Sequence, residues 1–142
     1  MAGRTILVTG TTRGIGEAIA GRLSADGNEV IGLARGTPDN PVGPHYNADL
    51  TDPDAVREVM GEIAANHRIT SVVHNAGYSR PQGVDEVTLD VYDDVMAINL
   101  RAMLLVTQPC IAQMKEAGGG RITSVSARAA LGKEMRTAYS AA

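Results

Sequence analysis

The sequence is poor in the residues that mark several classes of protein. Cysteine occurs once among the 142 residues, at Cys110, so no intrachain disulfide can form. The apolar surroundings of Cys110 predict a small buried side chain in a helix. The histidines, His45, His67 and His74, have no ligand-like spacing to one another or to the cysteine. We therefore expect no metal site.

Charge of one sign and long apolar runs are also scarce. The formal net charge is −3 and the arginines are scattered singly along the sequence, so the sequence predicts no basic patch that would bind a nucleic-acid backbone. No apolar run approaches the roughly 20 residues that span a bilayer, and a strand beginning by about Arg4 leaves no room for a signal peptide. These features predict a cytoplasmic globular protein without nucleic-acid or membrane partners. The 44% hydrophobic content suffices for the core of one domain, residues 1–142.

The stretch Ile6 to Gly16 organises the rest of the chain. Ile6 to Val8 is short, apolar and rich in β-branched residues, as a buried strand is. Gly10, Gly14 and Gly16 follow it, and glycine permits positive φ and close approach of a ligand to the backbone. Helical spacing begins there: Ile15, Ala18, Ile19 and Leu23. A helix N-terminus attracts anions, so the stretch predicts a pyrophosphate-binding turn, with a plain strand-to-helix turn as the alternative.

Strand and helix patterns then alternate. Strands are predicted at 29–34, 45–47, 69–74 and 121–126. Helices are predicted to begin at Thr51-Asp52-Pro53, near Thr88 and near Tyr139, and Pro109 should kink or split the long helix that begins near Thr88. This order predicts an α/β fold, a Rossmann-type doubly wound parallel sheet with helices on both faces, truncated after the fifth strand. Ligands bind such sheets at the carboxyl ends of the strands.

Five stretches stand in the order found in short-chain dehydrogenases/reductases, and the chain resembles that family throughout its length. The stretches are Thr9 to Gly16, Asp49-Leu50, Asn75-Ala76-Gly77, Asn99-Leu100 and Tyr139 to Ala142. The resemblance implies an NAD(P)-binding Rossmann domain in an oxidoreductase that moves a hydride between nicotinamide and a carbonyl or alcohol carbon. A carbonyl reductase, an alcohol dehydrogenase or a 3-oxoacyl reductase-like enzyme would fit. The alternative is a non-catalytic dinucleotide-binding or interaction module.

The resemblance also assigns a cofactor site. The glycine-rich stretch would hold the pyrophosphate, Asp49 and Leu50 would flank the adenine, and Asn75-Ala76-Gly77 would line the adenine-ribose side. Asn75-Ala76-Gly77 could instead simply turn the chain after a strand. The implied cofactor-binding residues are Gly10, Thr12, Arg13, Gly14, Ile15, Gly16, Arg35, Asp49, Leu50, Asn75, Ala76 and Gly77.

Charge at the end of the second strand favours NADP over NAD. An acid there would accept hydrogen bonds from the ribose 2′-OH and repel a 2′-phosphate, but Ala34 occupies the position and Arg35 follows it. Arg13 adds a second cation, and the planar fork of arginine suits phosphate. Both arginines could instead be solvated surface residues, which leaves NAD as the alternative.

The resemblance makes Tyr139 the group that donates or takes the proton at the reacting oxygen. The family's lysine, which lowers the pKa of the tyrosine, would be residue 143, so we expect residues 1–142 alone to be inactive and to form the N-terminal part of a larger enzyme. Counting back from Tyr139 places the family's serine at Ser126, whereas strand register places it at Ala127. Asn99 resembles the asparagine that orders a water on the proton path; the alternative is an amide bonded to backbone.

The resemblance further implies self-association through the long helix around 89–115. Leu100, Met103, Leu104 and Val106 extend its apolar surface beyond what one sheet face needs, unless they simply cover the sheet. We therefore expect a homodimer or homotetramer that acts on a small-molecule carbonyl or alcohol. The substrate itself is not readable, because the family's specificity loop would lie beyond residue 142.

Overall fold

The centre of the protein is a five-stranded parallel sheet in the order β3-β2-β1-β4-β5. The computed structural model describes residues 3–142. The strands are β1 (Thr5–Thr9), β2 (Glu29–Ala34), β3 (His45–Asn47), β4 (Ser71–His74) and β5 (Arg121–Ser124). The chain winds outward from β1 to β3 and then crosses back to β4 and β5, which confirms the predicted doubly wound, Rossmann-type sheet.

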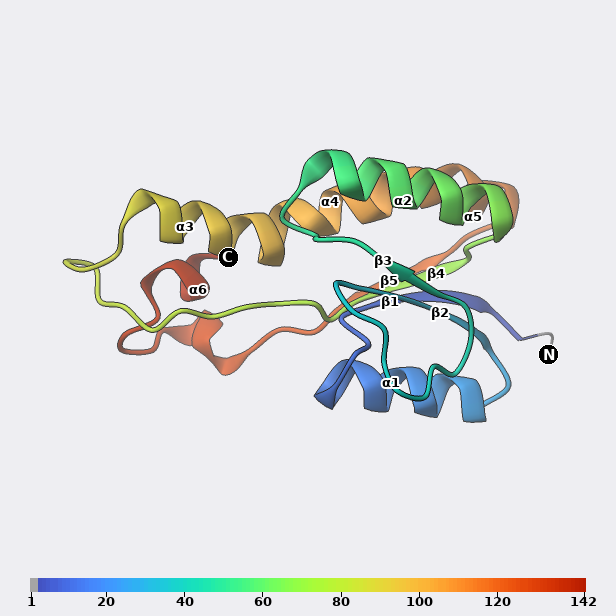
Figure 1. Cartoon of the computed structure of the whole chain (residues 1–142), viewed down its shortest axis with the longest axis horizontal. Coiled ribbons are helices and arrows are strands. Elements are labelled where there is room, and N and C mark those ends of the chain that lie inside the picture. Colours follow the sequence, from blue (N-terminus) through green and yellow to red (C-terminus); the bar gives the residue numbers. More distant parts are fainter. Residues whose placement is uncertain (1–2) are drawn as a thin grey trace.

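Helices cover both faces of this sheet, as Figure 1 shows. Helix α1 (Gly14–Ala25) lies on one face, whereas α2 (Pro53–Asn66), α4 (Ala102–Thr107) and α5 (Ile111–Glu116) lie on the other. Beyond the carboxyl edge of the sheet, α3 (Leu89–Met96) packs against α6 (Thr137–Ala141). Single-turn elements complete the chain: a π-helix at Ala97–Arg101 and 3-10 turns at Gln108–Cys110 and Arg128–Leu131.

The core follows the alternation of side chains along the strands. Leu7 of β1 packs into the cluster under α2 and α4, whereas Ile6 and Val8 face α1. Helix α2 begins as predicted, because the Asp52 side chain accepts hydrogen bonds from the first-turn backbone N–H groups. Its buried face is the predicted one: Val56, Val59, Met60 and Ile63.

The long helix is a continuous run from Leu89 to Glu116 that departs from α-helical geometry at two places. It passes through the π-helix, and its 3-10 turn contains Pro109, which confirms the predicted interruption. The run is 28 residues long with a mean hydropathy of 1.5 in its most apolar window, so by length and composition alone it could cross a membrane. Core helices of soluble proteins pass the same test. Buried side chains on this run join the core under α2: Ala102, Val106, Cys110 and Met114.

The buried face of α1 differs from the prediction. Ile15 is 64% exposed and Ala18 is also exposed, whereas Gly16 and Ala20 are buried. The first turn of α1 rests on the glycine-rich loop through Gly16, which rotates Ile15 away from the sheet. Two residues of the predicted face, Ile19 and Leu23, are partly buried and do pack against the core.

Element boundaries also shift by one or two residues, as helix and strand ends commonly do. Strand β4 begins at Ser71 rather than at residue 69, β5 ends at Ser124 rather than at residue 126, and α6 begins at Thr137 rather than near Tyr139. Strand β5 forms an edge of the sheet, and all of its residues are exposed.

Candidate cofactor and active site

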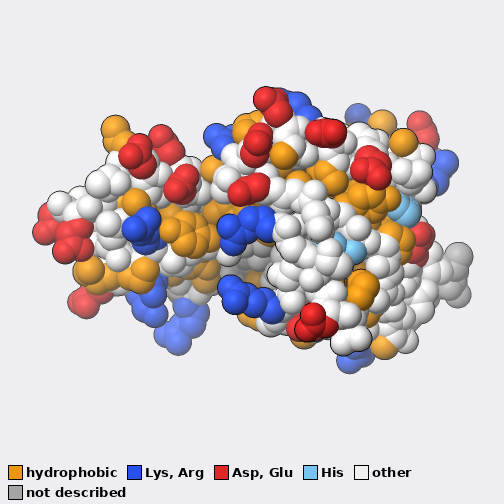
Figure 2. Space-filling view, in the orientation of Figure 1, with side chains coloured by type: hydrophobic (Ala, Val, Ile, Leu, Met, Phe, Trp, Pro, Cys, Tyr) orange, Lys and Arg blue, Asp and Glu red, His pale blue; other side chains and the backbone are white. Residues whose placement is uncertain are grey.

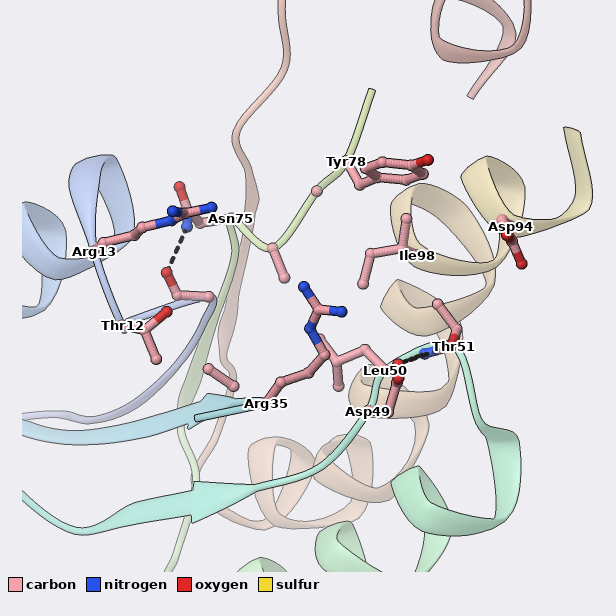
Figure 3. Close-up of a pocket in the computed structure, with 14 residues that line it drawn as sticks. Thr12, Arg13, Arg35, Asp49, Leu50, Thr51, Asn75, Tyr78, Asp94 and Ile98 are labelled. Atoms are coloured by element: carbon pink, nitrogen blue, oxygen red, sulfur yellow. Dashed lines mark hydrogen bonds between the residues drawn. The ribbon is translucent and has the colours of Figure 1, made fainter. Parts of the chain in front are cut away.

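A cavity of about 620 Å³ opens at the carboxyl edge of the sheet. It lies where the strand order reverses between β1 and β4, the place where open α/β sheets bind ligands. Figure 3 shows the side chains that converge on it. The cofactor residues expected from the sequence that line it are Gly10, Thr12, Arg13, Arg35, Asp49, Leu50, Asn75, Ala76 and Gly77. Gly14, Ile15 and Gly16 lie just beyond, on the first turn of α1.

The glycine-rich loop has the backbone of an anion site. Gly10 has a φ of +74° and Gly14 a φ of +62°, a region that L side chains rarely adopt. Among residues 3–142, no side chain caps the N-terminus of α1, in contrast to α2, where Asp52 caps its own helix. Because the first amides of a helix seek an acceptor, the amino end of α1 is open to a phosphate.

A set of hydrogen bonds fastens this loop to the end of β4. The Thr9 hydroxyl accepts from the backbone N–H groups of Asn75 at 3.1 Å and Ala76 at 3.0 Å. In return, Asn75 Nδ2 donates to the carbonyl oxygens of Thr9 at 3.1 Å and Gly10 at 3.2 Å. Asn75 therefore does more than turn the chain, because its amide fixes the position of the glycine-rich loop.

Two arginines give the cavity its positive charge. The Arg35 guanidinium reaches into the middle of the cavity from the end of β2, and Arg13 lies at the glycine-rich loop beside Asn75 (Figure 3). Ala34 lines the wall where an acid would oppose a 2′-phosphate. Figure 2 shows basic side chains beside the middle of this face of the molecule, whereas acidic side chains gather mainly along its upper, helical side. The cavity thus suits a multiply charged anion.

Asp49 is an acidic residue in the lining of the same cavity, and its carboxylate is influenced by the charge of Arg35. Its Oδ1 accepts from the Thr51 backbone N–H at 2.9 Å and from the Thr51 hydroxyl at 2.7 Å. These hydrogen bonds lower the pKa of the Asp49 carboxyl, and the charge of Arg35 lowers it further. Thr51 therefore fixes the orientation of an ionised carboxylate, which can accept a hydrogen bond from an amine or hydroxyl of a ligand.

The far end of the cavity contains residues that the sequence reasoning did not identify: Thr51, Tyr78, Asp94 and Ile98. The Tyr78 ring stands over this end in Figure 3, while Asp94 and Ile98 come from the long helix. The helical spacing of Asp94 and Ile98 predicts only that they lie on a helix. No local sequence pattern indicates that this helix extends past the edge of the sheet and reaches the cavity.

Asn99 lies in the π-helix, a rare element that often marks functional positions. Its Oδ1 accepts from the Tyr78 backbone N–H at 3.2 Å, and its Nδ2 donates to the carbonyl oxygens of Tyr78 and Val95, both at 2.8 Å. The amide is therefore bonded to backbone, as the alternative interpretation of the sequence expected. One lone pair of Oδ1 remains beyond these contacts.

The other expected catalytic residues, Tyr139 and Ser126, are not among the residues that line the cavity within the described part of the chain. Tyr139 is half-buried on α6 and packs against the small cluster formed by Val91, Val95 and Ala138. Ser126 and Ala127 are exposed in the segment that follows β5. Within residues 3–142, no hydrogen bond joins Tyr139, Ser126 and Asn99, and the cavity lining includes none of the three.

Comparison with known proteins places this site in context. A family model of the short chain dehydrogenases matches residues 4–142. D-threitol dehydrogenase of Mycolicibacterium smegmatis is 32% identical, over 98% of this chain and 58% of that protein. A 3-oxoacyl-(acyl-carrier-protein) reductase of Salmonella typhimurium is also 32% identical, over 99% of this chain and 62% of its own length.

Among solved structures, a 3-oxoacyl (acyl-carrier-protein) reductase from Agrobacterium tumefaciens with NADP bound is similar to this protein. It superposes with a TM-score of 0.88 at 27% identity, over 98% of this chain and 58% of that chain. The chain thus spans somewhat more than half the length of each of these relatives. The family match covers nearly the whole sequence, and the chain belongs to the short chain dehydrogenase family.

Proposed function

We propose that the protein is an NADP-dependent oxidoreductase that transfers a hydride between nicotinamide and a carbonyl or alcohol carbon. The observation that carries this proposal is the cavity at the strand-order reversal. It is lined by the glycine-rich loop that precedes α1 and by Arg35, whose guanidinium points into it. Similarity to reductases of 3-oxoacyl groups supports a carbonyl reductase. A 3-oxoacyl compound is accordingly the first substrate to test.

The charges around the cavity favour NADP over NAD as the cofactor. The 2′-phosphate of NADP would lie between Arg35 and the glycine-rich loop with Arg13, and Ala34 presents no acid against it. Thr51 donates both of its hydrogen bonds to Oδ1 of Asp49, so Oδ2 of the same carboxylate would accept from the adenine amine. NAD, which lacks the phosphate, is the alternative cofactor.

NADPH, when bound, supplies the hydride, and the residues of the chain handle the proton. We propose that the Tyr139 phenol donates its proton to the carbonyl oxygen and that Ser126, the only serine at the two candidate positions, donates a hydrogen bond to that oxygen. Val95 lies near both Tyr139 and Asn99, because it belongs to the cluster against which Tyr139 packs and its carbonyl accepts a hydrogen bond from Asn99. The free lone pair of Asn99 Oδ1 would accept from a water that returns a proton to Tyr139.

The protein is also proposed to act in the cytoplasm as a homodimer or homotetramer. Leu100 and Leu104 on the long helix are 49% and 57% exposed, and they form apolar surface on the helix that the family uses for assembly. We propose that a second copy of the chain covers this apolar surface.

NADPH consumption with a panel of ketones, aldehydes and 3-oxoacyl thioesters tests the function. The assay is run on residues 1–142 and on the longer chain that we propose contains them, each as wild type and as Tyr139→Phe. We expect turnover in the longer wild-type chain only, with NADPH binding unaffected by Tyr139→Phe. Equal turnover in Tyr139→Phe would contradict the proton-transfer role.

A non-catalytic dinucleotide-binding module is the second candidate, since Tyr139, Ser126 and Asn99 share no hydrogen bond within residues 3–142. NADPH binding without turnover in the longer chain, for every carbonyl of the panel, would favour this module. Absence of binding would exclude both candidates.

A further inference from the structure

His45 lies between the two segments that would hold the ribose phosphate of NADP. It opens β3 and pairs with Gly32 of β2 in parallel register. Its Nε2 is 2.9 Å from the Gly36 carbonyl oxygen, and its Nδ1 is 3.5 Å from the Thr11 hydroxyl oxygen. Gly36 directly follows Arg35, and Thr11 belongs to the glycine-rich loop. One imidazole ring therefore bridges two segments, each of which contains an adjacent residue that lines the cavity, Arg35 or Thr12.

The partners of this ring fix its tautomer. A carbonyl oxygen only accepts hydrogen bonds, so Nε2 must carry the proton and donate to Gly36. Nδ1 is then the acceptor for the Thr11 hydroxyl. Thr11 is only 4% exposed, so its hydroxyl has little water to bond instead. The ring thus uses both nitrogens to tie the two segments together.

Gly32 provides the space that the ring occupies. A Cβ at this position would lie 2.5 Å from His45 Nδ1 and 2.8 Å from Thr11 Oγ1. Gly32 has no positive φ, so the backbone does not demand glycine here. The ring explains why no side chain is present at Gly32, and Gly32, His45 and Thr11 form one close-packed unit that lines a separate, smaller pocket.

We infer that His45 is a positioning residue for cofactor choice. It holds the segment carrying Arg35 at a fixed separation from the loop carrying Arg13, so that both cations meet the same phosphate. This inference rests on the proposed function. NADH has no 2′-phosphate, so loosening the bridge weakens NADPH binding far more than NADH binding.

The test compares the dissociation constants of NADPH and NADH, by fluorescence titration, in the wild type, His45→Leu and His45→Gln. Loss of hydrogen bonds worth about 1.4 kcal/mol corresponds to about a tenfold weaker NADPH affinity in His45→Leu, with NADH changed less than about twofold. His45→Gln restores most of the preference, because an amide offers one N–H donor to Gly36 and one oxygen acceptor to Thr11.

Two further variants separate positioning from general loss of stability. His67→Leu removes the 2.9 Å bond between His67 and Tyr46, also on β3, and it should leave the preference for NADPH unchanged. Gly32→Ala keeps His45 but displaces its ring, and it should reduce the preference as His45→Leu does. Circular dichroism identifies folded samples, and Gly32→Ala decides the question if His45→Leu does not fold.

The outcomes distinguish this inference from the proposed function. A wild type that binds neither dinucleotide, or that prefers NADH, overturns the NADP proposal and the inference with it. A wild type that prefers NADPH, with the same preference in folded His45→Leu or Gly32→Ala, overturns the role of His45 alone. Equal weakening of NADPH and NADH in the variants also overturns it.

Discussion

Asn99 and Tyr78 hold each other through a reciprocal pair of hydrogen bonds, with the Tyr78 N–H donating to Asn99 Oδ1 at 3.2 Å and Asn99 Nδ2 donating to the Tyr78 carbonyl at 2.8 Å. A Cβ on Gly77 would lie 2.8 Å from Asn99 Oδ1, so the close approach needs glycine. The loop after β4, which forms a wall of the cavity, is thereby pinned to the π-helix.

Asn99→Asp should lower the free energy of unfolding by about 1–3 kcal/mol, because it removes the donor to Tyr78 and Val95 and leaves their carbonyls facing a carboxylate. Asn66→Asp is the matched control, since Asn66 Nδ2 also donates to a helical carbonyl, that of Glu62, but on an exposed helix end. The control should change stability by no more than about 0.5 kcal/mol. Urea unfolding measures both, and equal losses would show that the Asn99 contacts carry no special weight.

Two glycines of α1 should respond oppositely to alanine. A Cβ at Gly16 would run into the Gly10 carbonyl oxygen and Asn75 Nδ2, so Gly16→Ala must displace the glycine-rich loop and should cost about 1–3 kcal/mol while weakening NADPH binding. A Cβ at Gly21 meets nothing within 4 Å, so Gly21→Ala should stabilise the helix by up to about 1 kcal/mol. Thermal unfolding and NADPH titration of both variants test this, and a neutral Gly16→Ala would contradict the packing described for the loop.

His74 should make the protein less stable in mild acid. Burial lowers the pKa of His74 below the ordinary value of 6.5, and its Nε2 lies 2.8 Å from the Thr107 hydroxyl. Between the folded pKa and 6.5 the unfolded chain binds a proton that the folded chain does not, so stability falls as pH drops below 6.5 and is constant above it.

The pH dependence of urea unfolding, compared between the wild type and His74→Asn, isolates this contribution, because His45 and His67 are present in both proteins. The wild type should lose more stability than the variant as the pH falls below 6.5. Parallel profiles would contradict the role of His74.

Cys110 should be inert in the folded protein. The side chain is 1% exposed, and burial raises the pKa of its thiol to about 11, so almost no thiolate exists near neutral pH. Labelling by a thiol-reactive disulfide reagent should therefore proceed at the rate of unfolding and accelerate in urea. Labelling much faster than unfolding would show that the core around Cys110 opens locally.

The long helix should mediate self-association. Leu104→Arg places a charge on its exposed apolar surface and should shift the protein towards monomer in light scattering. Val84→Arg is the control, because Val84 is 80% exposed but lies outside the helix. An unchanged mass for Leu104→Arg, or the same change in Val84→Arg, would contradict assembly through this surface.

The sequence predicts the layers of this fold well, because periodicity and local capping are properties of short segments. The Asp52 cap and the interruption at Pro109 were predicted on those grounds and are confirmed. The orientation of Ile15 was predicted wrongly, since an apolar residue at a helix end follows the contact of Gly16 with the loop rather than the helical repeat.

Links between distant segments could not be predicted in this way. The bond from Asn99 to Tyr78 spans 21 positions and that from His45 to Thr11 spans 34, and neither leaves a local pattern. The alternatives for the serine, Ser126 and Ala127, stay open for a related reason. Both lie beyond Ser124, where β5 ends, so the strand register used to place the serine does not extend to either position.

The most direct test of the NADP site is the ratio of NADH to NADPH dissociation constants in the wild type, Arg35→Ala and Arg57→Ala. The wild type should prefer NADPH, and Arg35→Ala should lose about tenfold to a hundredfold in NADPH affinity, equivalent to about 1.5–3 kcal/mol for a charge-assisted contact, with NADH binding retained. Arg57→Ala, which removes an exposed pair with Asp54 on α2, should behave as the wild type. Equal affinities for the two cofactors in the wild type, or an unchanged ratio in Arg35→Ala, would contradict the account.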